Sequence, residues 1–133
     1  MGFADDVRDL LSTGASPITA EIFCGDLPER PATAICVAPT AGIGSTHTFG
    51  SVAGQAPFER LRCQVRARAG NYLAAEALIT SVNTRLDGLR NEAMNGRLYQ
   101  WMVGTTSPYY IGLDEAEQPL FGCNYDAYMT RTT

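Results

Sequence analysis

The 133-residue sequence contains no lysine and a single histidine, His47. All 10 basic residues are arginines, and 14 acidic residues outnumber them, which gives a formal net charge of −4. A protein that binds DNA nonspecifically needs a concentrated positive surface, and this composition gives no support for one. Arginine forms forked pairs with carboxylates better than lysine does, which would suit protein interfaces. A GC-rich genome would produce the same bias, so both explanations stay open.

Long apolar runs and paired cysteines are also missing. No stretch approaches the ~20 apolar residues of a membrane-spanning helix, and the acidic start, residues 1–6, lacks the apolar run of a signal peptide. The four cysteines are Cys24, Cys36, Cys63 and Cys123, and none has CxxC or other metal-ligand spacing. We expect four reduced, buried thiols in an intracellular folding environment, and no metal or cofactor.

The strongest pattern in the chain begins at Glu59. Polar side chains fall on even positions from Arg60 to Arg68, and apolar ones on odd positions from Leu61 to Ala69. Successive side chains of a strand point to opposite faces, so this alternation predicts a strand with one polar and one apolar face. The polar face would carry Arg60, Arg62, Gln64, Arg66 and Arg68.

A helix is predicted directly after this strand. Apolar residues recur there at spacings of three and four, and form one helical face: Tyr72, Ala75, Ile79, Val82, Leu86 and Leu89. Asn71 is the expected N-cap and Gly88 the expected C-cap. A one-sided strand followed by a one-sided helix indicates a helix lying on one face of a sheet.

The start of the chain predicts another helix. Its apolar face would consist of Phe3, Val7, Leu10 and Leu11. Its other side would carry Asp5, Asp6 and Asp9. Acidic residues in the early turns suit the positive end of the helix dipole.

Two strands are predicted before the central one. Residues 19–24 fit a short strand, and residues 33–38 form a continuous apolar run that is typical of an inner strand buried on both faces. The connection between them is short and contains two prolines, so we expect these two strands to pair antiparallel.

Residues 39–57 predict a long loop. Gly, Ser, Thr and Ala dominate this stretch, and no periodicity survives in it. A structureless loop of this length in a small domain is uncommon and usually functional. Within the loop, Ile43, His47 and Phe49 are candidate contact residues.

The remainder of the chain predicts further strands. Asn95-Gly96 is typical of a hairpin turn with two positive φ angles. Strands are expected over residues 97–104, 109–113 and 120–131, with an acidic turn at residues 114–119. In the last of these strands the alternating residues are Phe121, Cys123, Tyr125, Ala127 and Met129. The whole chain, residues 1–133, is therefore predicted to form one α+β domain. It would have a mostly antiparallel sheet, two helices packed on one face, and a long loop between the second and third strands.

The sequence contains no convincing catalytic set. His47 lies beside Ser45 and Ser51, but the G-x-S-x-G motif of a serine hydrolase is absent, so a small hydrolase is only a remote alternative. Asp114, Glu115 and Glu117 lack the twelve-residue calcium-loop signature, and we interpret them as a solvated turn. We therefore expect a protein that is not an enzyme.

The arginine row has three possible explanations. Neighbouring arginines repel one another unless acids, phosphates or solvent meet them. The row could pair with carboxylates on adjacent strands or simply be hydrated. It could instead meet an acidic surface on another subunit, or bind phosphate.

Three stretches resemble phage minor capsid proteins of the tail-terminator type. Residues 22–31 followed by 34–37 resemble the early strand, proline turn and second strand of that family. Residues 58–68, with the core Gln64-Val65-Arg66-Ala67-Arg68 ahead of a helix, resemble its most recognisable strand, although Leu61 stands where proline is more usual. Residues 101–112, followed by Asp114 and Phe121, are similar to its C-terminal hairpin.

The resemblance implies a structural protein of long-tailed phages. Such proteins form a hexameric ring on the last ring of the tail tube, stop its growth and offer a surface for head attachment. The implied partners are other copies of the chain, the tail tube protein, a head-completion or connector protein, and passing DNA in the lumen, with no membrane. The implied location is the head-proximal end of the tail in the virion, after assembly in the host cytoplasm. A head-closure or adaptor ring is the alternative.

A ring requires two different patches that meet head to tail. The arginine face of residues 60–68 could meet the acidic turn at Asp114, Glu115 and Glu117. The loop carrying Ile43, His47 and Phe49 could become ordered against a neighbour or the tube.

Overall fold

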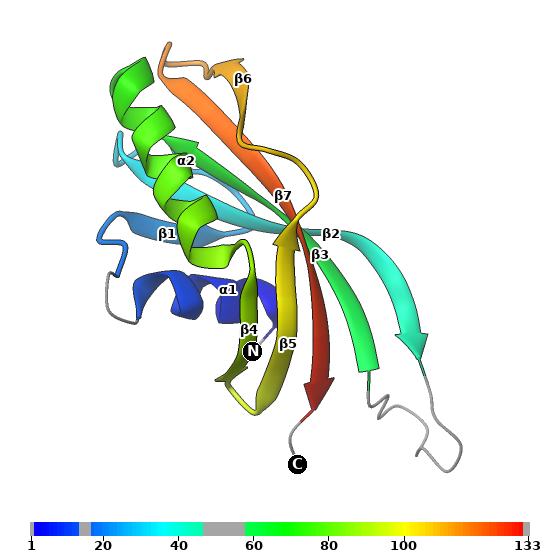
Figure 1. Ribbon diagram of the computed structural model, residues 1–133. Helices are drawn as coiled ribbons and strands as arrows, with labels where there is room; N and C mark the ends of the chain where they lie inside the picture. Colours follow the sequence, from blue (N-terminus) through cyan, green and yellow to red (C-terminus); the bar gives the residue numbers. More distant parts are fainter. Residues whose placement is uncertain (1, 14–16, 47–57, 132–133) are drawn as a thin grey trace.

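The computed structural model describes residues 2–13, 17–46 and 58–131 of the protein (Figure 1). The helices are α1 (Phe3–Ser12) and α2 (Tyr72–Leu86). The strands are β1 (Glu21–Cys24), β2 (Ala34–Thr46), β3 (Phe58–Arg68), β4 (Leu89–Met94), β5 (Arg97–Gly104), β6 (Tyr109–Leu113) and β7 (Pro119–Arg131). They form one sheet in the order β1-β2-β3-β7-β5-β4, with β6 paired to β7 off this path. The α+β class and the mostly antiparallel sheet are confirmed, because only β1 and β2 pair parallel in the described part of the chain.

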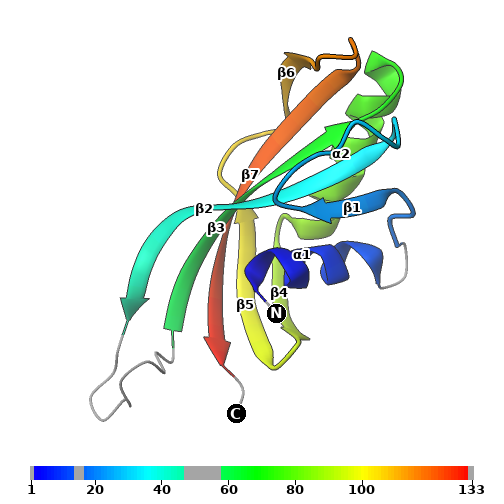
Figure 2. The ribbon, with the colours of Figure 1, turned by 180° about the vertical axis from the view of Figure 1, so that it is seen from behind.

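Strand β7 lies at the centre of the sheet. Along one side it pairs with the whole of β3, from Phe58 opposite Thr130 to Arg68 opposite Leu120. Along its other side, β6 pairs with the first residues of β7 and β5 pairs with the last ones. The sheet twists strongly, so that the lower ends of β2, β3 and β7 fan away from α2 (Figures 1 and 2).

The prediction that β1 and β2 pair antiparallel is wrong. The two strands are parallel, with Glu21 opposite Ala34 and Cys24 opposite Val37. Parallel pairing usually needs a long crossover. Here β1 has only 4 residues, which span roughly 13 Å, and the connecting residues 25–33 can return over that distance.

The first part of the predicted loop, residues 39–46, is strand. Strand β2 continues to Thr46, and Ile43 lies opposite Arg60 of β3, with shifts in register on both sides of this pair. Hydrogen bonding to β3 extends the strand despite its small side chains, which gave no periodic signal. His47 and Phe49 lie outside the described residues.

Helix α2 follows its sequence pattern closely. Asn71 accepts a hydrogen bond from the Ala74 amide at 2.9 Å, which confirms the N-cap. Four residues of the predicted apolar face are buried: Ala75, Ile79, Val82 and Leu86. Tyr72 is instead 47% exposed. The helix ends at Leu86, and Gly88 has φ +82° just beyond the cap residue Asp87.

Strand β4 was not predicted, and Leu89 belongs to it rather than to α2. Its sequence Leu-Arg-Asn-Glu-Ala-Met is rich in residues that strands disfavour, and its middle four residues are exposed at the sheet edge. The hairpin turn that joins β4 to β5 was predicted correctly, because Asn95 and Gly96 both have positive φ.

The core combines both helices with the apolar faces of the strands. Odd-numbered residues of β3 and β7 contribute to it, among them Val65 and Tyr125, and α1 contributes Val7, Leu10 and Leu11. The interior cysteines are buried as expected, but Cys24 is exposed because it ends an edge strand.

Asp6 was expected on the polar side of α1, away from the core, but the structure buries it. It is fully buried, where it accepts hydrogen bonds from Arg97 Nη1 at 2.9 Å, from Asn95 Nδ2 at 2.7 Å and from the Tyr99 hydroxyl. The carboxylate therefore joins α1 to the β4–β5 hairpin.

Candidate functional site

The polar face of β3 is the candidate site. On this face β3 runs between β2 and β7, and the register sets Arg62 beside Asp126, Gln64 beside Asn124 and Arg66 beside Gly122. The alternation predicted from the sequence is confirmed, because Cys63, Val65 and Ala67 point into the core.

Asp126 of β7 holds two of the arginines. Its carboxylate accepts from Arg62 Nε at 2.9 Å and from Arg60 Nη2 at 3.5 Å. The Asp126 side chain is only 8% exposed, whereas those of Arg60 and Arg62 are 42% and 45% exposed. The carboxylate thus anchors both guanidinium groups at the surface and leaves part of each open to a partner.

Three aromatic rings lie next to these arginines. Tyr128 of β7 stacks on Phe58 and on Trp101, with ring centroids 5.8 Å apart in both pairs. The guanidinium carbon of Arg60 lies 5.8 Å from the centre of the Trp101 ring, within the range of a cation–π contact. This face therefore offers partly exposed aromatic surface as well as positive charge.

Gln64 and Arg66 occupy the middle of the face. Gln64 Nε2 donates to the Tyr109 hydroxyl at 2.8 Å, which ties β3 to β6. In the described part of the chain Arg66 forms no ion pair with a carboxylate, and its buried Nε has no hydrogen-bond acceptor. Burial raises the pKa of the neighbouring Cys36 thiol, and Arg66 acts against that shift.

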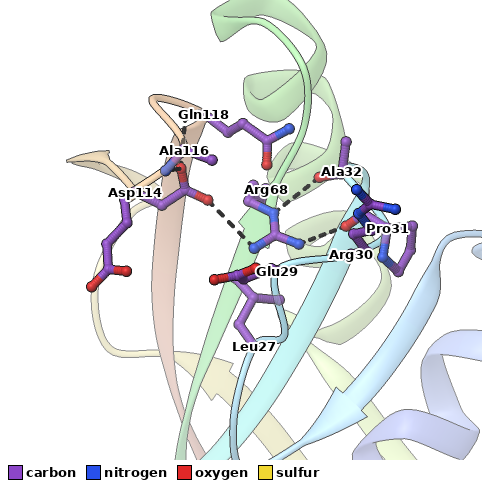
Figure 3. A pocket seen from close by; sticks show the side chains of 10 residues that line it. Leu27, Glu29, Arg30, Pro31, Ala32, Arg68, Asp114, Ala116 and Gln118 are labelled. Carbon is purple, nitrogen blue, oxygen red and sulfur yellow. Dashed lines mark hydrogen bonds and ion pairs between the residues drawn. The ribbon is translucent and has the colours of Figure 1, made fainter.

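Arg68 is buried in the domain, unlike the other arginines of β3. Its side chain is 3% exposed and donates to the carbonyl oxygens of Pro31 and Ala32. A longer ion pair of 3.4 Å joins it to Asp114. Figure 3 shows this guanidinium at the floor of an open hollow between the β1–β2 connection and the β6–β7 turn.

Asp114 also shapes the acidic turn. Its Oδ1 accepts from the amides of Ala116 and Gln118 at 2.9 and 2.8 Å. Glu115 and Glu117 are exposed on the same turn. The turn therefore presents two solvated carboxylates, while the third is used to fold it.

The structure thus separates the predicted site residues into groups. The arginine face brings together Arg60, Arg62, Gln64 and Arg66. Arg68 connects to the acidic turn instead, and Ile43 extends β2 beside Arg60.

The residues of β7 that lie beside the arginines were not identified from the sequence. Only its odd positions were used, because they alternate so clearly from Phe121 to Met129. The even positions Asn124, Asp126 and Tyr128 form the complementary polar face. The available sequence signal was that Asp126 is the one acidic residue in this strand.

No group of three or more histidine, cysteine or acidic side chains in residues 2–13, 17–46 and 58–131 is placed to hold a metal ion. None of the described helices has the length and apolar character to cross a bilayer.

Comparison with known proteins gives one family. The family described as bacteriophage tail terminator protein matches the chain over residues 5–131, nearly its whole length. No curated protein matches the sequence.

Proposed function

Because the chain belongs to the bacteriophage tail terminator protein family, we propose that six copies form a ring that caps the tail tube and receives the head. The family match over residues 5–131 carries this proposal. It makes the protein a structural component of the virion that contacts other tail and head proteins. What we propose beyond the family match is that the protein caps the tube, that the ring has six copies, and that its neighbours are those named below.

In this proposal residues 1–133 act as one domain with both helices on one face of the sheet. The domain works without a cofactor and without catalysis. Its partners are its own copies, the tail tube protein and a head-completion or connector protein, and DNA passes through the lumen. The ring sits at the head-proximal end of the tail after assembly in the host cytoplasm.

The contacts are assigned to the residues singled out in the sequence. The proposed interface set is Arg60, Arg62, Gln64, Arg66, Arg68, Ile43, His47, Phe49, Asp114, Glu115 and Glu117. Arg66 is the best supported member, because its charge has no carboxylate partner among the described residues. Arg68 contributes indirectly, by holding the turn that carries Glu115.

Electron microscopy and crosslinking test the function directly. Purified protein is added to tail tubes that lack it, and the tube ends are imaged in negative stain. We expect a six-fold ring at one end, and crosslinks from this ring to the tube protein. Crosslinks only to the portal or an adaptor would identify a head-closure or adaptor ring instead. A location only at the baseplate would contradict both.

A further inference from the structure

Exposed large apolar side chains gather in one place on the molecule. Of the six in the described residues, four lie on the first turn of α2 or on the same side of β6: Tyr72, Leu73, Tyr110 and Leu113. Ile111 of β6 is also exposed, but its side chain packs over Gly122 on the other face of the sheet. Leu73 is 74% exposed. Exposed apolar groups that cluster in this way mark interaction sites more often than single ones do.

The aromatic members of this cluster are held in contact with one another. The Tyr72 ring lies 5.3 Å from that of Tyr110 and 5.0 Å from that of Phe121, which is itself buried. The edge of β6 that faces away from β7 has no strand partner among the described residues. The cluster therefore lies on a helix and a strand, and its rings are fixed by their mutual contacts.

Acidic residues border this cluster. Leu113 is followed directly by the turn that carries the exposed Glu115 and Glu117. That turn carries three carboxylates, and only one of them, that of Asp114, pairs with a guanidinium group in the described residues, that of Arg68. We call this the apolar–acidic surface, and define it by Tyr72, Leu73, Tyr110, Leu113, Glu115 and Glu117.

The opposite combination occurs on the polar face of β3. That face carries three guanidinium groups and one carboxylate, that of Asp126. Its aromatic rings lie beside Arg60, and Arg66 lies about 20 Å further along β3. We call this the arginine–aromatic surface, and define it by Phe58, Arg60, Arg62, Arg66, Trp101 and Tyr128. Each surface has apolar area, and their excess charges are opposite.

One copy cannot bring its two surfaces together. Phe121, beneath the Tyr72 ring, points to the core side of β7, whereas Tyr128 points to the other side. Two copies can, if one presents the first surface and its neighbour the second. Contacts of that type are heterologous, and they close into a ring when the rotation between neighbours divides a full turn evenly.

We propose that the apolar–acidic surface of one copy docks on the arginine–aromatic surface of the next. This contact rests on the proposed ring and specifies how its subunits meet. Leu73 and the tyrosines supply the apolar centre, and Glu115 or Glu117 neutralises Arg66 at the rim.

Paired variants of the full chain test this contact by sedimentation velocity and native mass spectrometry, with and without tail tubes. Leu73→Glu places a charge in the apolar centre and should weaken ring formation at least about tenfold. Ser81→Glu is the matched control, because it adds the same charge at an exposed position of the same helix, about 12 Å further along. It should assemble like the original chain.

Mixing the variants identifies which surfaces meet. Leu73→Glu retains an intact arginine–aromatic surface, and Arg66→Glu retains an intact apolar–acidic surface. Each alone should remain monomeric, whereas an equimolar mixture should form heterodimers joined by one intact contact. Rings that persist in Leu73→Glu, or a mixture that stays monomeric while the unaltered chain forms rings, would overturn the proposed contact and leave the ring intact. An unaltered chain that never self-associates, even on tubes, would overturn both.

Discussion

Arg62 donates through Nε to the carboxylate of Asp126 at 2.9 Å, and these residues face each other across β3 and β7. The acid is nearly buried, while the base is about half exposed. Removing Asp126 and removing Arg62 should therefore lower the stability of the fold by different amounts. Loss of Asp126 leaves two guanidinium groups without their acid, whereas loss of Arg62 leaves Arg60 in place.

We predict that Asp126→Asn lowers the free energy of unfolding by about 1–3 kcal/mol, the range for removing one partner of a charged hydrogen bond near the surface. Urea denaturation measures this loss. Glu115→Gln, at an exposed position, should change the value by about 0.5 kcal/mol or less. Equal stabilities of the two variants would show that the pairing with Arg60 and Arg62 contributes nothing to the fold.

Asp6 should contribute more to stability than any other carboxylate of α1. It is fully buried and receives three hydrogen bonds, including the one from Arg97. Asp6→Ala should cost about 3–5 kcal/mol, because it removes the buried carboxylate that Asn95, Arg97 and the Tyr99 hydroxyl share. Asp9→Ala, at a partly exposed position of the same helix, should cost about 1 kcal/mol or less. Denaturation curves in which both variants lose the same stability would contradict this.

Arg68 allows a test of guanidinium geometry. Its Nε and Nη2 donate to two adjacent carbonyl oxygens while Nη1 reaches Asp114. A lysine keeps the charge but cannot supply this planar fork. We predict that Arg68→Lys lowers the free energy of unfolding by about 2–4 kcal/mol. Arg90→Lys on the exposed strand β4 serves as the control, with an expected change of about 0.5 kcal/mol or less. A lysine variant as stable as this control would mean that charge alone suffices.

Periodicity predicted the elements that bury one face. The alternation in β3 and in β7, and the spacing of Ala75, Ile79 and Val82 in α2, each report a core-facing row, and the structure places all three in the core. Turn chemistry worked equally well at Asn95-Gly96, where two positive φ angles are needed.

The incorrect predictions have a common physical origin, which is the pairing between strands. Strand β4 and the far end of β2 are held by hydrogen bonds to a neighbouring strand, and hydrogen bonding leaves no apolar period in the sequence. The direction of β1 depends on the path of a loop, which local patterns do not record. The polar face of β3 was identified, but its partner Asp126 could be found only by reading β7 in the same register.

The last prediction concerns thiol reactivity, because the four cysteines differ in burial. Cys24 is exposed and the other three are buried. Burial raises the pKa of the Cys63 thiol to about 12 and also raises that of Cys36. Partial burial, aided by the nearby Asp5 carboxylate, raises the pKa of Cys24 as well. Only the thiolate reacts, so a raised pKa slows the reaction at neutral pH.

We therefore expect one of the four thiols to react readily with Ellman's reagent in the folded protein, and all four in urea. The rate of this first reaction should increase about tenfold per pH unit below the pKa of Cys24, because the thiolate fraction rises by that factor. Cys24→Ser should remove the fast phase, while Cys36→Ser should leave it unchanged. A second fast thiol in the folded protein would mean that β2, β3 or β7 opens readily, since Cys36, Cys63 and Cys123 lie within those strands.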